Sequence, residues 1–334
     1  MDNKKILIIG GAGFIGHNLA LKLKLKNYDV NIIDGLIVNN INTVIGNLDN
    51  LPNPELSHSM LNERFDLLKE NNIPLHVQDA RDYNGLSNII NQINPNIIVH
   101  LAAVSHANRS NKDPFSTFDH SLRTLENALD NTRNKVDHFI YFSSSMVYGN
   151  FKSDKVDENT VCEPLGIYGA LKYSGELMVK AYNQTFDLPY TIIRPSALYG
   201  ERCISRRVGQ IFIENAISDK DITIDGDGSD LLDFTYIQDL VGGIIKIIEN
   251  KNAINNTFNI TYGSARKISD LIDILKISFP NIKINYKKRD KLMPHRGTLS
   301  IEKAINLIGY KPDWPIEKGY SQYIDWYKKF KNYS

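Results

Sequence analysis

The sequence has little of several features that would place it in a specialised class. Its 334 residues include two cysteines, Cys162 and Cys203, whose separation suits neither a disulfide framework nor a metal site. No apolar run approaches the ~20 residues of a membrane span, and no apolar leader precedes the first expected strand. The formal net charge of +1 gives no general field to attract nucleic acid or an anionic membrane. We therefore expect a cytoplasmic protein that binds a small molecule, with no metal and no nucleic-acid or membrane partner.

The chain does have the content and the pattern of a large α/β protein. Hydrophobic residues make up 42% of it, enough for one large domain and a smaller lobe. Apolar runs typical of buried parallel strands alternate with segments whose apolar residues recur at helical spacing. We expect strands over 6–9, 28–33, 75–77, 96–101 and 139–142, and helices from 15 onward, over 57–71, over 115–133 and around 168–185. This alternation predicts a doubly wound parallel Rossmann sheet with right-handed crossovers.

The regular alternation loosens after about residue 195. We predict an NAD-binding Rossmann domain over residues 1–195, to which 234–261 returns as a helix and a strand. A smaller C-terminal α/β substrate lobe, with a helix over 207–218, is expected to comprise 196–233 and 262–334. The polar, asparagine-rich stretch 36–53 shows no periodicity and is expected to be a long loop at the carboxyl edge of the sheet.

The stretch from Lys5 to Asp34 predicts a dinucleotide site. Gly10 permits a tight turn, Gly13 lets the backbone approach a pyrophosphate, and Gly16 lets the helix lie close to the strand. The phosphates would lie at the helix N-terminus, where unpaired N–H groups favour an anion. Asp34 follows at the spacing of about 20 residues at which an acid accepts hydrogen bonds from the adenosine ribose. Because its carboxylate would repel a 2′-phosphate, the expected cofactor is NAD.

Other residues are expected around the same cofactor because they follow the strands of the sheet. Phe14 and Ile15 belong to the glycine-rich turn itself. Asp79 and Ala80 come directly after the third strand and would lie near the adenine. Small residues let a loop pass close to a bound cofactor, and the loop after the fourth strand begins Leu101, Ala102 and Ala103.

A candidate catalytic group follows the fifth strand. The strand runs into a serine cluster at 143–145, and Tyr168 and Lys172 lie four residues apart on one face of the next expected helix. A nearby ammonium favours a phenolate and would lower the pKa of the tyrosine from ~10 towards neutrality. Tyr168 would then be a usable general base.

Taken together, these motifs resemble the extended short-chain dehydrogenase/reductase family, the nucleotide-sugar epimerases and dehydratases. The resemblance covers nearly the whole chain. It rests on Gly10-x-x-Gly13-x-x-Gly16, His100-Leu-Ala-Ala103, Ser144-x-x-x-Tyr148-Gly, Tyr168-x-x-x-Lys172, Arg194-Pro-Ser-Ala-Leu-Tyr-Gly200 and Gly309-Tyr-Lys-Pro312. It implies that Tyr168 is the base, that Lys172 holds both this tyrosine and the nicotinamide ribose, and that Ser144 hydrogen-bonds the reacting hydroxyl.

The activity implied by the resemblance is that of an NAD-dependent nucleotide-sugar epimerase acting at C4. Tyr168 would remove the O4 proton while C4 gives hydride to NAD⁺, and the 4-keto sugar would be reduced again from either face. A net oxidoreductase acting on a nucleotide sugar is the first alternative, and a non-catalytic NAD-sensing protein is the second. Retention of Ser144, Tyr168 and Lys172 disfavours a sensor. The resemblance also suggests a homodimer formed through helices 115–133 and 168–185.

The sequence departs from the family pattern where the nucleotide diphosphate would bind. Ala197 stands in place of a usual asparagine and Leu232 in place of an arginine, so two nucleotide-binding side chains are absent. Replacement donors are expected among Arg202, Arg206, Arg207, Arg289, His295 and Arg296, since arginine suits a diphosphate or a carboxylate. The residues expected to border the sugar are Ser105, His106 and Ser145. His120 takes the place of another common asparagine, and its role stays open.

One further departure bears on the reaction. Dehydratases and decarboxylases of this family carry acidic residues in the two positions after the serine or threonine that matches Ser144. Eliminating water needs an acid and a base beside the oxidised carbon. Here the two positions hold Ser145 and Met146, neither of which titrates near neutral pH. The sequence therefore predicts re-reduction of the 4-keto sugar, without dehydration or decarboxylation.

Overall fold

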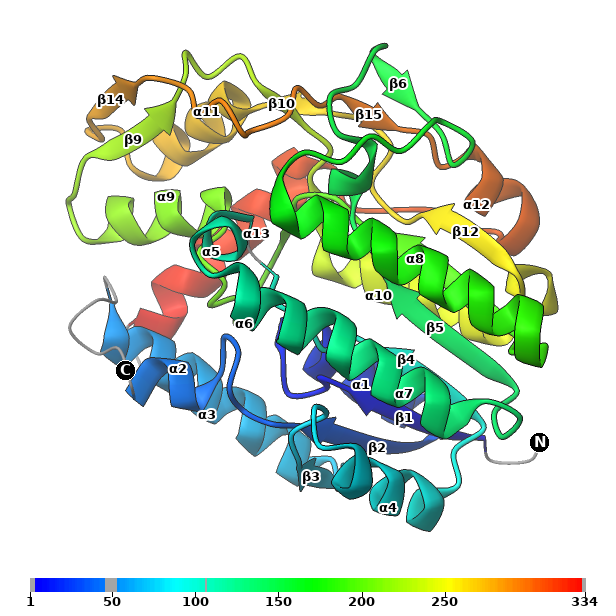
Figure 1. The fold of residues 1–334 in the computed structure, drawn as a ribbon. Coiled ribbons are helices and arrows are strands. Elements are labelled where there is room, and N and C mark those ends of the chain that lie inside the picture. Colours follow the sequence, from blue (N-terminus) through cyan, green and yellow to red (C-terminus); the bar gives the residue numbers. More distant parts are fainter. Residues whose placement is uncertain (1–3, 46–52, 106, 332–334) are drawn as a thin grey trace.

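The computed structural model describes residues 4–45, 53–105 and 107–331. A seven-stranded sheet lies between two layers of helices and forms the larger part of the molecule (Figure 1). Its strands run in the order β12-β7-β5-β4-β1-β2-β3, and each neighbouring pair is parallel. They are β1 (Lys5–Ile9), β2 (Asp29–Asp34), β3 (Leu75–Val77), β4 (Ile97–His100), β5 (His138–Phe142), β7 (Tyr190–Arg194) and β12 (Asn256–Asn259). The predicted doubly wound parallel Rossmann sheet is confirmed.

The strands read as unbroken apolar runs because both faces of the sheet are covered. On β1, Ile6 and Ile8 belong to one core, and Leu7 and Ile9 belong to a second core on the opposite face. The first core includes α1 (Phe14–Leu25), α3 (Pro54–Glu70) and α10 (Ile237–Glu249) and continues into helices of the smaller lobe. Those of the second are α4 (Tyr83–Ile93), α7 (Thr124–Thr132) and α8 (Gly166–Phe186). Two separate cores therefore hold the sheet rigid from both sides.

The segment predicted to return to the sheet lies against it. Helix α10 packs beside α1, and β12 extends the sheet next to β7, with Phe258 opposite Ile193. Residues late in the chain thus complete the sheet begun by the first strands. The exact division of the chain into two domains stays a prediction.

A smaller lobe lies beyond the carboxyl ends of the sheet strands (Figure 1). Its main elements are α9 (Val208–Ile217), β9 (Ile222–Asp225), α11 (Ile268–Ser278) and β14 (Ile284–Lys287), and β9 and β14 pair in parallel. Its smaller elements and connections are β6 (Lys155–Val156), β8 (Leu198–Tyr199), β10 (Leu231–Leu232), β11 (Thr235–Tyr236), β13 (Arg266–Lys267), β15 (Thr298–Leu299), α12 (Glu302–Ile308) and α13 (Ile316–Lys331), whereas η4 (Lys251–Ala253) joins α10 to β12. In an open α/β sheet, ligands bind at this carboxyl edge. The lobe therefore covers the place where a ligand is expected.

Two sequence-based expectations need correction. The stretch 36–53, expected to be a loop, contains a short helix, α2 (Ile41–Ile45), whose buried apolar residue is Val44. A single buried side chain leaves too little periodicity to signal a helix. The helix expected over 115–133 is interrupted: α6 (Pro114–Phe118) is followed by a π-helical turn, η2 (Asp119–Arg123), and then α7. The hydroxyl of Thr124 bonds the carbonyl oxygens of His120 and Ser121, as side chains that compete for backbone groups do.

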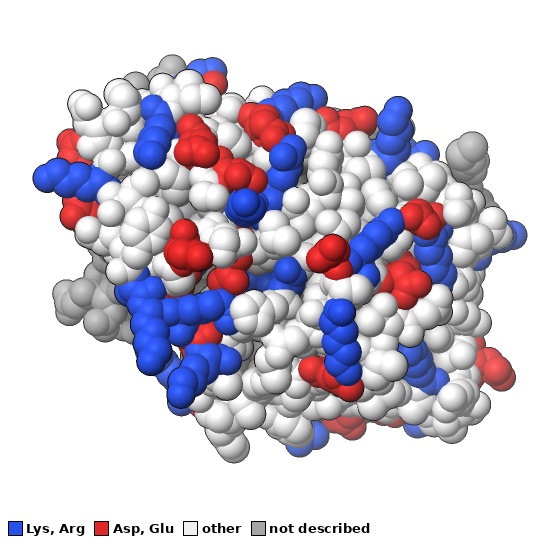
Figure 2. Space-filling view, turned by 90° about the horizontal axis from the view of Figure 1, so that it is seen from above, with Lys and Arg blue, Asp and Glu red and all other residues white. Residues whose placement is uncertain are grey.

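The surface seen from above carries charged residues of both signs. Figure 2 shows lysine and arginine side chains mingled with aspartate and glutamate across this face. Because charges of both signs mingle on this face, binding of an anion there must depend on individual basic side chains rather than on a broad field.

Over the described ranges, no helix is long and apolar enough to cross a membrane.

Candidate active site

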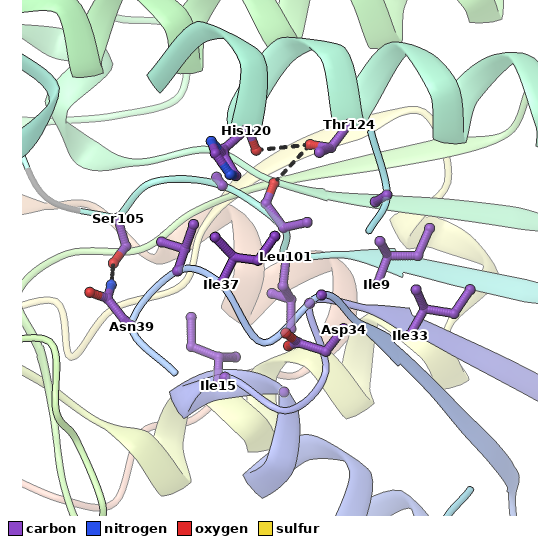
Figure 3. Close-up of a pocket in the computed structure, with 18 of the residues that line it drawn as sticks. Ile9, Ile15, Ile33, Asp34, Ile37, Asn39, Leu101, Ser105, His120 and Thr124 are labelled. Carbon is purple, nitrogen blue, oxygen red and sulfur yellow. Dashed lines mark hydrogen bonds between the residues drawn. The ribbon is translucent and has the colours of Figure 1, made fainter. Parts of the chain in front are cut away.

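The first of two adjoining pockets lies at the carboxyl ends of β1, β2 and β4 (Figure 3). It is built from the glycine-rich turn, the end of β2 and the loop that follows β4. Every predicted cofactor residue outside α8 lines it: Gly10, Gly13, Phe14, Ile15, Gly16, Asp34, Asp79, Ala80, Leu101, Ala102 and Ala103. The structure thus brings together residues that the sequence places on four separate strand ends.

The glycine-rich turn has the geometry that a dinucleotide needs. Gly10 has φ +83°, and a Cβ atom there would lie 2.7 Å from the backbone nitrogen of Ala102. A Cβ atom on Gly16 would lie 2.5 Å from the Cα atom of Gly11, so α1 could not pack on the turn with a larger residue. Gly13 is the N-cap of α1 and no side chain caps the helix, which leaves its N-terminus free to receive an anion.

Asp34 ends β2 at the wall of this pocket (Figure 3). One carboxylate oxygen accepts from the N–H of Ala12 at 3.0 Å and the other accepts from the N–H of Leu36 at 2.8 Å. Burial raises the pKa of Asp34, and these two backbone hydrogen bonds oppose the rise. Each oxygen keeps a second lone pair, so the fixed carboxylate can still accept from a ribose diol.

His120 projects into the same pocket from η2 (Figure 3). Its Nδ1 atom lies 2.8 Å from the carbonyl oxygen of Ser116, a pairing in which Nδ1 must carry the proton. Among the described residues, its buried Nε2 atom has no partner. In the neutral imidazole this atom is an acceptor, and it suits a hydroxyl of a bound cofactor. A π-helical turn often marks such a functional position.

The second pocket adjoins the first and shares Ile15, Leu101, Ala103, Ser105 and Arg207 with it. It lies between the sheet and the smaller lobe. The predicted catalytic and substrate residues that line it are Ser105, Ser144, Ser145, Tyr168, Lys172, Arg206, Arg207 and Arg296. A cofactor in the first pocket would therefore meet a substrate in the second close to Ile15 and Arg207.

Tyr168 and Lys172 are one turn apart on α8, and Ser144 lies at the end of β5. The side chains of Tyr168 and Ser144 are close enough for Ser144 to influence the tyrosine pKa, and Ser144 Oγ accepts from the N–H of Met146 at 3.2 Å. The Nζ atom of Lys172 donates to the carbonyl oxygen of Phe142 at 2.7 Å, and burial lowers the pKa of this lysine to about 8. The three side chains thus face one pocket.

The direction of the tyrosine pKa differs from the one expected. Burial raises the pKa of Tyr168, and the opposing influences are the Arg207 guanidinium and the hydrogen bond from Ser144. The ammonium of Lys172, which was expected to lower this pKa, instead donates a hydrogen bond to the Phe142 carbonyl oxygen. The cation that favours the phenolate therefore comes from the smaller lobe, and the spacing of residues on α8 could not reveal it.

A buried polar network beneath the serine cluster was missed from the sequence. Glu176 accepts from Ser143 Oγ at 2.5 Å and pairs with Arg194 at 2.7 Å, and both charged side chains are at most 3% exposed. Arg194 also donates to the hydroxyl of Tyr148 at 2.9 Å. Each charge is satisfied by a partner, as burial requires. The sequence signal that could have indicated this network is the acidic residue Glu176, one turn after Lys172 on the same helix.

Several predicted substrate residues lie away from the second pocket. The guanidinium of Arg202 contacts His17 at 3.2 Å and Glu63 at 3.4 Å, behind the glycine-rich turn, and does not line the pocket. Arg289 is held by Asp230 at 2.9 Å and by two backbone carbonyls. It lines a third pocket in the smaller lobe, together with His295 and Arg296. The position of His106 is outside the described residues.

Comparison with known proteins identifies the family. A model of the NAD dependent epimerase/dehydratase family matches residues 6–261, more than half of the chain. The chain belongs to this family. The membership confirms the resemblance to the extended short-chain dehydrogenases/reductases and confirms NAD as the cofactor. The fit of the first pocket to a dinucleotide agrees with it.

Family members similar to this chain include both epimerases and dehydratases. A putative UDP-glucose 4-epimerase of Methanocaldococcus jannaschii is 32% identical over 97% of this chain and 98% of the relative. The crystal structure of UDP-glucuronic acid 4-epimerase from Bacillus cereus, in complex with UDP-glucuronic acid and NAD, has a TM-score of 0.85 at 30% identity, and the match covers 97% of this chain and 99% of that one. A dTDP-glucose 4,6-dehydratase of Escherichia coli is 26% identical over 97% of this chain and 92% of the relative. The family therefore leaves the reaction open between these two classes, and the residues of this chain must distinguish them.

Proposed function

We propose that the protein is an NAD-dependent nucleotide-sugar epimerase that acts at C4 through a transient 4-keto sugar. The observation that carries the proposal is the second pocket, which places Tyr168, Lys172 and Ser144 beside the cofactor pocket with no acid at the two positions after Ser144. The similarity to a solved 4-epimerase over nearly the whole chain supports it. We infer the position of the sugar from the residues that both pockets share.

In this proposal the residues of the chain move one proton and hold the groups around it. NAD⁺, when bound, takes up hydride from the sugar and gives it back. Tyr168 accepts the proton of the O4 hydroxyl and later returns it, because it lines the pocket together with Ser144. Ser144 donates to the oxygen on which charge develops. Lys172 lies close enough to the pocket to hold the nicotinamide ribose while it fixes the end of β5 through Phe142.

Two arginines are proposed to bind the anionic part of the substrate. The Nε atoms of Arg207 and Arg296 are buried and have no hydrogen-bond partner among the described residues. Burial lowers the pKa of Arg296 to about 10, and the nearby cations Arg289 and Arg207 add to the effect. A diphosphate would supply both the acceptors and the negative charge that these side chains need. The two arginines would then bind the diphosphate in place of the asparagine and the arginine that family members carry at the positions of Ala197 and Leu232.

The positions of the acidic side chains in the second pocket favour epimerisation over dehydration. Ser145 and Met146 line the pocket directly after Ser144. The carboxylates among its described lining residues are Asp225, which pairs with Lys287 at 2.8 Å, and Asp290, which accepts from the N–H of Leu292 at 2.9 Å. Both belong to the smaller lobe, on the β9 and β14 side. A base and an acid beside C5 and C6 would have to come from elsewhere.

The proposal is tested by incubating the purified protein with NAD⁺ and with UDP-, dTDP-, GDP- and CDP-sugars, both hexoses and hexuronic acids, and following the products by NMR. We expect interconversion of a pair of C4 epimers without net formation of NADH. Accumulation of NADH with a keto sugar would identify a net oxidoreductase instead. A C6 methyl signal from a 4-keto-6-deoxy sugar, or release of CO₂ from a hexuronate, would contradict the assignment.

Arg207→Met is expected to raise the KM for the nucleotide sugar at least about tenfold. A charge-assisted hydrogen bond contributes roughly 1.5–3 kcal/mol, and a tenfold change corresponds to about 1.4 kcal/mol. Steady-state kinetics with the substrate found by NMR gives the value. Arg266→Met is the matched control, because Arg266 is exposed and paired with Glu317 at 2.6 Å. Equal KM values for Arg207→Met and the wild type would remove Arg207 from the site.

The proposed assembly is a homodimer through α6 and α8. The support is a set of exposed apolar side chains on these two adjacent helices: Phe115 (85% exposed), Phe118, Ile167 and Leu177. Exposed apolar side chains that lie together mark an interaction surface, and contact between α6 and α8 brings these two helices together. We expect Phe115→Glu combined with Leu177→Glu to give a monomer in size-exclusion chromatography with light scattering. Ile277→Glu, at an equally exposed position on α11, is the control. A dimer that survives the double substitution would place the interface elsewhere.

A further inference from the structure

A buried arginine lies behind the glycine-rich turn and donates to backbone carbonyls. Arg64, on α3, is 1% exposed. Its Nε and Nη2 atoms donate to the carbonyl oxygen of Arg202, the former at 3.1 Å, and its Nη1 atom lies 3.4 Å from the carbonyl oxygen of Ala12. Arg64 therefore connects the glycine-rich turn with a segment that lies almost 200 residues further along the chain.

A second connection joins the same two segments. The Nε atom of Arg202 lies 3.2 Å from Nε2 of His17, and Nδ1 of His17 lies 2.9 Å from the carbonyl oxygen of Gly13. Burial and the cations Arg64 and Arg202 hold the pKa of His17 well below its usual range. The imidazole is therefore neutral, with Nδ1 as donor and Nε2 as acceptor. The side chain of Asn18 contacts the same Nε2 atom at 3.2 Å.

The two connections close a ring of hydrogen bonds. It runs from the Ala12 carbonyl through Arg64 to the Arg202 carbonyl, and from the Arg202 side chain through His17 to the Gly13 carbonyl. At Arg202 the backbone has φ +61°, a conformation that a non-glycine residue adopts at a cost. The ring therefore fixes both the backbone and the side chain of Arg202 against the turn that is expected to hold the pyrophosphate.

The segment fixed in this way leads into both pockets. It runs from Arg202 to the start of α9, and within it Ser205 and Arg207 line the cofactor pocket although they belong to the smaller lobe. Arg207 lines the second pocket as well. On the other side of the ring, the N–H of Ala12 donates to Asp34, which faces the cofactor. One hydrogen-bonded unit thus borders both ligands.

We propose that Arg64, His17 and Arg202 are positioning residues that hold the 202–207 segment over the cofactor pocket and so couple the NAD site to the sugar site. The inference rests on the proposed function for its substrate readout and on family membership for NAD. The three residues touch neither ligand pocket, so they act through Arg207 and Ser205 on one side and through the glycine-rich turn on the other. A ring that acts as one unit is disabled when it is cut at any point.

The test is a double-mutant cycle on two independent links of the ring. Arg64→Met removes the links to the Ala12 and Arg202 carbonyls, and Arg202→Met removes the links to His17 and Glu63 while keeping its own carbonyl. We expect each substitution to raise the Kd for NAD⁺ and the KM for the nucleotide sugar about tenfold. Any change in kcat should have the direction that Arg207→Met gives, because Arg207 favours the Tyr168 phenolate. The double variant should be no more than about twofold worse than the weaker-binding single variant.

Two controls separate positioning from a general loss of stability. Ile90→Ala, in the core beneath α4, lowers stability away from the ring and should leave Kd and KM unchanged. Arg64→Lys keeps the charge but reaches fewer acceptors, so its Kd and KM should lie between those of the wild type and Arg64→Met. Arg202 is partly exposed, and its methionine variant remains foldable if the Arg64 variant does not.

The outcomes distinguish this inference from the proposed function. If the wild type converts no nucleotide sugar, the proposed function fails, and calorimetric titration with NAD⁺ alone still tests the ring. An unchanged Kd for NAD⁺ in both single variants would overturn the inference. Effects that multiply in the double variant would overturn it too, because independent contacts add in free energy whereas a second cut in an already open ring has no further effect. An equal rise of Kd in Ile90→Ala would also count against it.

Discussion

Tyr168→Phe is expected to lower kcat about a thousandfold and to change the Kd for NAD⁺ less than about twofold. A positioned acid–base group contributes roughly 10²–10⁴ to the rate, and the substitution removes the hydroxyl while the ring keeps its volume. The measurements are kcat from the NMR assay and Kd from calorimetry. Tyr173→Phe, on the same helix but outside the described lining of both pockets, is the matched control.

The pH dependence gives a second readout of the same residue. Burial raises the pKa of Tyr168, so the fraction of phenolate, and with it the rate, should increase with pH from neutrality. The pKa of the Lys172 ammonium is lowered by burial to about 8, and its positive charge is lost as pH rises through that value. Arg207→Met should move the rising limb to higher pH, because the guanidinium favours the phenolate. A Tyr168→Phe protein with near wild-type turnover would remove the tyrosine from the mechanism.

The sheet and the cofactor residues could be predicted because their signals are local. A parallel strand buried on both faces must be an apolar run, and the run Ile6–Ile9 ends directly on Gly10. The carboxyl ends of parallel strands meet at one edge, so residues such as Asp34 and Ala80 were expected to converge without knowledge of any contact. The long asparagine-rich stretch hid α2 because one buried valine makes no pattern.

The features that escaped prediction depend on contacts between distant parts of the chain. Arg64 lies on the apolar stripe of α3 with Met60, Leu61 and Leu68, where a lone arginine is ordinarily taken as a solvated residue. Its role depends on Arg202, which was instead expected in the substrate pocket. Separation along the chain gives no information on either contact. A charged residue at a position on the apolar face of a helix is the sequence signal that could have indicated a buried partner.

The shift of the Tyr168 pKa also depends on contacts that a sequence motif cannot report. The spacing of Tyr168 and Lys172 correctly placed both side chains on one pocket. It could not report burial, which dominates the shift, nor the approach of Arg207 from the smaller lobe. An electrostatic effect sums over all neighbours in space, whereas a motif reports neighbours along one helix.

NADP⁺ is expected to bind at least about 100-fold more weakly than NAD⁺, and Asp34 is expected to be the cause. The carboxylate is fixed by the N–H groups of Ala12 and Leu36 and cannot turn away from a 2′-phosphate. Two like charges about 4 Å apart repel by roughly 4 kcal/mol at an effective dielectric constant of 20, which exceeds the ~2.7 kcal/mol of a 100-fold ratio. Calorimetric titration of the wild type with each cofactor measures the ratio.

The variant that isolates this effect is Asp34→Asn. An amide keeps the shape of the side chain but removes its charge, and it can accept from only one of the two N–H groups now bound. We expect the Kd for NAD⁺ to rise about tenfold, the cost of roughly one hydrogen bond, while the preference over NADP⁺ shrinks to less than about tenfold. Asp82→Asn at the N-cap of α4, outside the described lining of the pocket, should leave the preference unchanged.

Because burial raises the pKa of Asp34, the preference of the wild type should also weaken as pH falls and the carboxyl group takes up a proton. Equal Kd values of the wild type for the two cofactors at neutral pH would show that this carboxylate does not face the ribose, and the search for the discriminating group would then turn to His120.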